Sequence, residues 1–159
     1  LGLITLLLMI LTTSKNKEKM ALNIKELTII NEMALTVGLV MLTIGNFLGG
    51  MWANESWGRY WGWDPKETWA LISIMIYAFV IHMRLIPGLR SRFGFSVASV
   101  LAFGSIMMTY FGVNFYLAGL HSYAKDDQEI SITYIATALV IITLLSVFAY
   151  RKHLKYFKN

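Results

Sequence analysis

The feature that most constrains this chain is a series of four apolar stretches, each long enough to cross the hydrocarbon core of a membrane. A helix needs roughly 20 residues to span about 30 Å of hydrocarbon. The four stretches cover approximately residues 27–52, 67–86, 93–120 and 130–150. Composition agrees, because 57% of the residues are hydrophobic and 14% are charged, which is too apolar for a soluble domain. We therefore predict an all-α, polytopic integral membrane bundle with about four full transmembrane helices.

A shorter apolar run opens the sequence. The segment LGLITLLLMIL, residues 1–11, has no initiator Met or basic leader and runs into TTSKNKEK. It resembles the end of another membrane helix rather than a signal peptide. We therefore expect a partial N-terminal helix and a sequence that begins within a longer protein. Without repeats or low-complexity linkers, residues 1–159 are expected to form a single membrane domain.

The basic residues predict the orientation in the membrane. Eleven of the fourteen Lys and Arg residues lie in alternate connections or in the C-terminal tail. They are Lys15, Lys17, Lys19, Lys25, Arg84, Arg90, Arg92, Arg151, Lys152, Lys155 and Lys158. The positive-inside rule assigns this side to the cytoplasm, so the remaining connections face outward. The net charge of +5 is then explained by topology and anionic lipid, and no nucleic acid partner is expected.

The most unusual segment is WGRYWGWDPKETW, residues 57–69, which contains four of the five Trp residues. An interfacial anchor at the headgroups would account for one or two of these indoles. Gly58 and Gly62 alternate with them, and glycine lets backbone approach a ligand closely. The pattern predicts an outward-facing stacking platform for a large planar ligand, with an arginine that could pair with ligand carboxylates. The platform residues are Trp57, Arg59, Tyr60, Trp61 and Trp63.

A helix start comes directly after this platform. Asp64 is in the position of an N-cap, Pro65 in the first helical position, and Glu67 three residues after the cap. This spacing is typical of a capping box, in which the two carboxylates accept backbone N–H groups reciprocally. The cap would fix the platform at the mouth of the next helix.

The run WGRYWGWDPKETWALI, followed by IYAFVIHMRL and later by NFYLAGLHSYA, resembles the WWD signature of the haem-handling membrane proteins of cytochrome c biogenesis, specifically the CcsA (ResC) type. The resemblance covers about residues 46–124 and makes residues 52–69 the external WWD segment of the C-terminal part of a cytochrome c assembly domain. It implies that haem b is a substrate in transit, presented to an apocytochrome c whose CxxCH thiols add to the haem vinyl groups. Asp64 and the platform residues would contact the haem.

The same resemblance implies where the protein works and with what. It implies a component of a cytochrome c synthetase (haem lyase) that acts with a CcsB/ResB-type membrane subunit or fused half. The location implied is a bacterial cytoplasmic membrane, or its organellar equivalent, with the WWD segment outside and the C-terminus in the cytoplasm.

Two histidines are candidate ligands of haem iron at separate sites. His82 lies fifteen residues after Glu67, or about 22 Å along a helix that rises 1.5 Å per residue, whereas His121 lies in an outward connection. Bonds from metal to imidazole are about 2 Å long, so the two side chains cannot hold one iron. The resemblance implies that His82 belongs to a transmembrane pair and His121 to an external pair. The second His of each pair is missing from this sequence.

Two other function classes fit the residues alone. A polytopic transporter or structural subunit would use the Trp-rich segment as an interface anchor and would bind no chromophore. A b-haem or quinone electron-transfer subunit would retain its haem throughout turnover, but the separation of the two histidines argues against a haem held by this chain alone.

Overall fold

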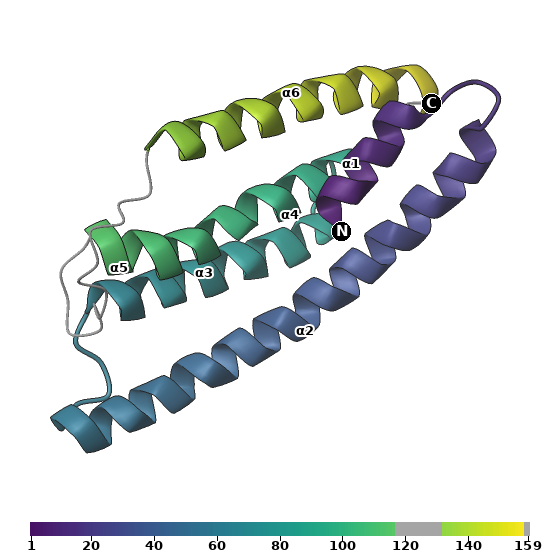
Figure 1. The fold of residues 1–159 in the computed structure, drawn as a ribbon. Helices are drawn as coiled ribbons and strands as arrows, with labels where there is room; N and C mark the ends of the chain where they lie inside the picture. The colour runs from purple at the N-terminus through teal and green to yellow at the C-terminus, as the bar shows by residue number, and fades with distance from the viewer. Residues whose placement is uncertain (117–131, 158–159) are drawn as a thin grey trace. The chain divides into compact units, whose positions relative to one another are not determined.

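The computed structural model describes residues 1–116 and 132–157, and the regular structure in these residues is helical. The helices in Figure 1 are α1 (Gly2–Leu11), α2 (Lys17–Trp57), α3 (Pro65–His82), α4 (Arg92–Met107), α5 (Val113–Tyr116) and α6 (Ile132–Tyr156). A 3₁₀ turn covers Met83–Leu85 and a π-helical turn covers Met108–Gly112. Four helical stretches, Lys17–Trp57, Pro65–Leu85, Arg92–Gly112 and Thr133–Tyr156, are long and apolar enough to cross a membrane. The predicted all-α, multi-pass architecture with a shorter N-terminal helix is confirmed.

Helix α2 is much longer than the predicted stretch 27–52. Its 41 residues correspond to about 60 Å at 1.5 Å per residue, twice the thickness of the hydrocarbon core. Lys17, Lys19 and Lys25, expected in a connection, lie within this helix. Lys, Glu, Ala, Leu and Met all favour helix, so the helix continues through polar sequence where hydropathy alone predicts a loop.

The other spans differ from prediction mainly at their ends. Helix α3 begins at Pro65 and ends at His82, and the 3₁₀ turn carries the chain towards Pro87, whose ring disfavours helix in the preceding residue. The stretch predicted as 93–120 is interrupted by the π-helical turn, and its last residues lie outside the described part of the chain. Helix α6 extends beyond the predicted end at residue 150 to Tyr156.

The described residues form two compact parts. The first, here called the basic part, contains residues 1–34, 82–100 and 132–157, and the second, the Trp-rich part, contains residues 35–81 and 101–116. All five Trp residues belong to the Trp-rich part.

The basic part is built around the packing of α1 against α6 (Figure 1). One cluster of buried apolar residues in this part consists of Leu6, Met9, Ile24 and Ala149. At the end of α1, the Lys152 ammonium group donates a hydrogen bond to the carbonyl of Thr12 (3.1 Å), which satisfies a carbonyl that the helix leaves without an internal partner. Close packing also requires Gly2, because a Cβ there would collide with the Ser99 side chain.

Two polar contacts tie α2 to the elements around it in the basic part. The Asn31 amide donates a hydrogen bond to the Ser99 hydroxyl (3.0 Å), and both side chains are buried. Glu32, a charged residue within an apolar stretch, forms an ion pair with Arg84 of the 3₁₀ turn. In a membrane protein such pairs satisfy charges that lipid cannot solvate.

Candidate functional site

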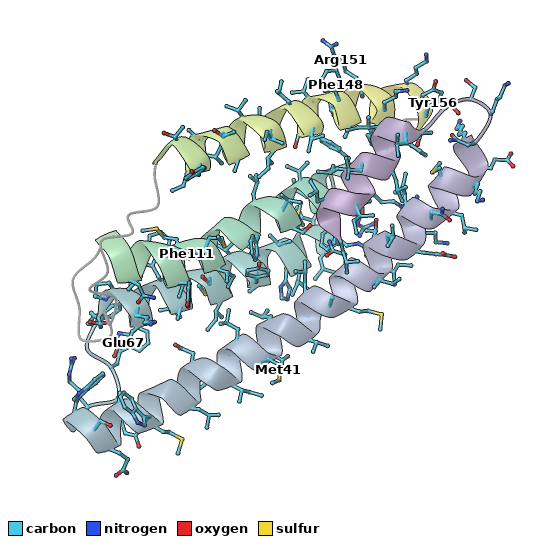
Figure 2. The ribbon with its side chains drawn as sticks, in the orientation of Figure 1. Met41, Glu67, Phe111, Phe148, Arg151 and Tyr156 are labelled. Carbon is cyan, nitrogen blue, oxygen red and sulfur yellow. The ribbon has the colours of Figure 1, made fainter. Side chains whose placement is uncertain are left out.

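The predicted capping box is present at the start of α3. The Asp64 carboxylate accepts a hydrogen bond from the N–H of Lys66 (3.3 Å), and the Glu67 carboxylate accepts one from the N–H of Asp64 (3.2 Å). Glu67, labelled in Figure 2, accepts a second from the N–H of Gly62 (2.8 Å). Asp64 is buried. One side chain of α3 therefore anchors two backbone groups of the preceding loop.

The loop between α2 and α3 uses two left-handed backbone positions. Gly58 has a φ of 70° and Trp63 a φ of 57°. This region suits glycine but is unusual for a bulky residue. The indole of Trp63 is 72% exposed, so burial does not explain why a Trp occupies this position. Backbone strain retained at an exposed aromatic residue is a recognised mark of functional sites.

The indoles do not form one flat surface. Trp61 and Trp63 meet edge to face, with ring centroids 5.7 Å apart and an interplanar angle of 88°. Trp52 and Trp57 do the same at 5.1 Å and 79°. Edge-to-face packing is a preferred arrangement of aromatic pairs. The three platform indoles therefore do not stack as one surface: Trp61 pairs with Trp63, and Trp57 pairs with Trp52 from outside the predicted platform.

A cleft of about 480 Å³ lies in the Trp-rich part, within the range of about 300–1,000 Å³ found for small-molecule and cofactor sites. It is lined by Met41, Leu42, Gly45, Asn46, Gly49, Gly50, Trp52, Tyr60, Trp61, Lys66, Glu67, Ala70 and Thr109. Figure 2 labels Met41 on α2 and Glu67 at the start of α3, two of these residues. The cleft thus has mostly apolar and aromatic walls with a few polar groups.

Three glycines, Gly45, Gly49 and Gly50, form part of the α2 wall of the cleft, here called the glycine wall. A Cβ added at Gly45 or Gly49 would meet no atom within 4 Å, so both positions face open space. At Gly50 the loop comes close, since an added Cβ would lie 3.2 Å from the carbonyl oxygen of Tyr60. Glycine thus both opens the cleft and lets the aromatic loop fold onto the end of α2.

Hydroxyl and amide groups connect α3 to the π-helical turn that contains the cleft residue Thr109. The Ser73 and Thr109 hydroxyls lie 3.0 Å apart, and Thr109 also lies 2.8 Å from the carbonyl oxygen of Ser105. Immediately after the π-helical turn, the Asn114 side-chain oxygen accepts a hydrogen bond from the Lys66 ammonium group (3.4 Å). These contacts join the first turns of α3 to the chain around the π-helical turn.

The predicted site residues divide into three groups. Tyr60 and Trp61 line the cleft, whereas Trp57, Arg59 and Trp63 do not. The guanidinium group of Arg59 lies against Gly62, in the place that a Cβ on that glycine would take. The carboxylate of Asp64 serves the helix cap described above.

The two histidines are not brought together among the described residues. His82 is the last residue of α3 and is exposed. His121 lies outside the described residues. The roles of both as haem ligands stay predictions.

Sequence reasoning missed the cleft residues Asn46, Lys66 and Thr109 and the glycine wall. The sequence does indicate the glycine wall, because Gly45 and Gly49 are four residues apart in a membrane helix. This spacing lets another group approach the helix backbone. For Lys66 the sequence carries no such signal, because its direction towards the cleft depends on how the start of α3 folds.

Comparison with known proteins gives the family. A family model described as Cytochrome C assembly protein matches residues 1–121. This chain belongs to the cytochrome c assembly protein family. Within this family it is 64% identical over 104 residues to Protein NrfI of Wolinella succinogenes, a match covering 65% of this chain and 12% of that protein. It is 48% identical over 102 residues to the cytochrome c biogenesis protein CcsA of Cuscuta reflexa, covering 64% of this chain and 33% of CcsA.

A third relative in the cytochrome c assembly family is CcsA of Prochlorococcus marinus strain AS9601, which is 46% identical over 99 residues, or 62% of this chain and 32% of that protein. The matched region therefore spans a third or less of the length of these curated relatives. The resemblance to CcsA-type proteins predicted from the WWD segment is confirmed.

Proposed function

We propose that this chain contributes to cytochrome c maturation by holding haem b in the cleft of the Trp-rich part and presenting it to apocytochrome c. The observation that carries the proposal is the cleft itself, with a glycine wall on α2 and the aromatic side chains of Trp52, Tyr60 and Trp61 around it. A flat, mostly apolar ring system needs close backbone approach and aromatic contact. The relatives' printed names, cytochrome c biogenesis protein CcsA among them, support the same role.

The rest of the site would come from residues beyond the cleft. Under this proposal His121 ligates the haem iron on the outer side, and His82 holds haem at a separate transmembrane station. The resemblance places the second external imidazole upstream of the WWD segment, and the second transmembrane imidazole would come from another part of the protein or another subunit. The membrane would be the bacterial cytoplasmic membrane or an organellar equivalent, with the aromatic loop outside.

The chemistry would belong to the two substrates. Each thiol of the CxxCH motif adds across one haem vinyl group, so that a carbon–sulfur bond forms and hydrogen passes to the other vinyl carbon. The addition is balanced without an oxidant. The chain would supply orientation and ligation, which convert a slow bimolecular encounter into reaction between positioned groups. In this sense it is a component of a cytochrome c synthetase.

The glycine wall allows a direct test. Gly49→Leu in the full-length gene product should fill the cleft without a clash, because a Cβ there meets nothing within 4 Å. Gly38→Leu is the matched control: its Cβ also meets nothing within 4 Å, but Gly38 does not line the cleft. Haem copurifying with each variant is measured from Soret absorbance, and cytochrome c output from haem staining. We expect Gly49→Leu to lose both and Gly38→Leu to retain both.

A second pair of substitutions tests the aromatic wall. Trp61→Ala should lower haem occupancy because Trp61 lines the cleft, while Trp57→Ala should retain it because Trp57 does not.

Equal haem content in Gly49→Leu and Gly38→Leu would rule out the cleft as the haem site. A purified complex with no Soret band would favour a transporter, and haem that is never passed to apocytochrome c would favour electron transfer.

A further inference from the structure

The basic part contains a cavity of its own, with a volume of about 230 Å³. The side chains that line it come from four helical segments: Met9 of α1, Ile24 of α2, Arg92 of α4, and His153 and Phe157 at the end of α6. This volume is below the lower limit of about 300 Å³ for small-molecule and cofactor sites. The cavity therefore suits one end of an elongated ligand better than a whole cofactor.

Apolar side chains form much of the cavity wall. Met9 and Ile24 are buried and belong to the apolar cluster of the basic part. The His153 ring stacks with the rings of Phe93 and Phe157, at centroid distances of 5.8 Å and 6.1 Å and interplanar angles of 25° and 24°. A ligand that fills this cavity therefore needs an apolar segment.

Arg92 brings a permanent positive charge to the same cavity. The residue is exposed, and within the ranges 1–116 and 132–157 its guanidinium group has no hydrogen bond or ion pair. Other cations of this part are engaged, since Arg84 pairs with Glu32 and Lys152 donates to a backbone carbonyl. The planar guanidinium group, with five N–H donors, matches the oxygens of a phosphate.

The charge around the cavity also favours an anion. The described residues of the basic part include ten Lys and Arg residues but three acidic ones, which are Glu18, Glu26 and Glu32. None of these three lines the cavity. An excess of one sign of charge raises the local concentration of ligands of the opposite sign.

The expected topology supplies a source of such anions. The end of α6, where Figure 2 labels Arg151 and Tyr156, lies on the side that the positive-inside rule assigns to the cytoplasm. The cytoplasmic leaflet carries anionic phospholipids, and basic pockets between transmembrane helices on that side bind their headgroups. A phospholipid combines a phosphate with apolar chains, which is the combination that this cavity requires.

We propose that the cavity of the basic part is a binding site for an anionic phospholipid. The guanidinium group of Arg92 pairs with the phosphate, and the first carbons of an acyl chain lie against Met9, Ile24 and Phe157. A free phosphate ion would satisfy Arg92 but leave the apolar wall uncovered. The lipid joins the start of α4 to the end of α6. This site is separate from haem handling and does not depend on it.

The test uses photoreactive phosphatidylglycerol with a diazirine near the ester end of one acyl chain. It is added in trace amount to phosphatidylcholine nanodiscs that hold the full-length gene product, and crosslinks are mapped by mass spectrometry. Photoreactive phosphatidylcholine is used in parallel. Phosphatidylglycerol should label the cavity residues roughly ten- to a hundredfold more than phosphatidylcholine does, the range expected for a charged hydrogen bond.

Three variants assign this preference to Arg92. Arg92→Met should label equally with both lipids, whereas Arg92→Lys should keep part of the preference, because an ammonium group retains the charge but loses the bidentate geometry. Arg151→Met is the matched control, since Arg151 is exposed in the same part and does not line the cavity, and it should behave as the wild type. An unchanged unfolding temperature in lipid-free detergent shows that Arg92→Met is folded.

Several results would overturn the proposal. They are equal labelling of the wild-type cavity by both lipids, no labelling there at all, a full preference in Arg92→Met, or a lost preference in Arg151→Met. Inorganic phosphate is also added at its cellular concentration and compared with sodium chloride of the same ionic strength. Loss of labelling with phosphate alone would assign the site to the free ion instead of a lipid.

Discussion

Because the Glu67 carboxylate accepts two backbone hydrogen bonds, we predict that substituting this one residue strongly destabilises the loop before α3. Its carboxylate accepts the N–H groups of Gly62 and Asp64, at 2.8 Å and 3.2 Å. A hydrogen bond to a charged group contributes about 1.5–3 kcal/mol. Taking the lower value for this half-buried site, Glu67→Ala should destabilise the loop by about 3 kcal/mol. Glu67→Gln keeps an acceptor in place and should lose about half of that.

Hydrogen–deuterium exchange of the ligand-free, full-length gene product measures this effect at the two amides concerned. Because about 1.4 kcal/mol corresponds to a factor of ten, Glu67→Ala should speed exchange at Gly62 and Asp64 about a hundredfold. Glu55→Ala is the control, since it removes an exposed carboxylate from the last turns of α2. Exchange in Glu67→Ala within threefold of the wild type would refute the view that this side chain holds the loop.

Three further predictions concern strain, ion pairing and topology. Trp63→Gly should be more stable than Trp63→Ala by about 1 kcal/mol in thermal unfolding, because both lose the indole but only glycine accepts a φ of 57° without strain; equal stability would remove the strain argument. Glu32→Gln and Arg84→Met should each destabilise the protein, and the double variant should be about 1 kcal/mol more stable than the sum of the two effects implies; simple additivity would show that the ion pair contributes nothing. The chain has no Cys, so in intact cells a membrane-impermeant thiol reagent should label Tyr60→Cys and spare Ser14→Cys, whereas the opposite result would invert the topology.

The fold class could be predicted because hydropathy over twenty residues is a strong local signal. The start of α3 was predicted to the residue, since Asp64, Pro65 and Glu67 act through contacts within a few positions of one another. The length of α2 was not predicted, because the Lys-rich sequence of its first turns is as compatible with a loop as with a helix that extends beyond the membrane.

The site was predicted only in part, because its geometry depends on backbone angles and on contacts between helices. Trp61 was named from its segment and does line the cleft, but the perpendicular pairing of Trp61 with Trp63 depends on backbone angles that composition does not reveal. Lys66 and Asn46 face one cleft from different helices. That juxtaposition is a tertiary property, and a single sequence carries no direct signal for it.

The π-helical turn at Met108–Gly112 also limits how the length of this chain can vary. A π-helical turn accommodates one residue more than the α-helical turn it replaces, and each residue added to a helix rotates the downstream residues by about 100°. Deleting one residue here would let the helix become regular and would turn Asn114 away from Lys66. Many single substitutions would leave that register intact. Insertions and deletions in this turn should therefore be rarer among natural relatives than changes of residue type.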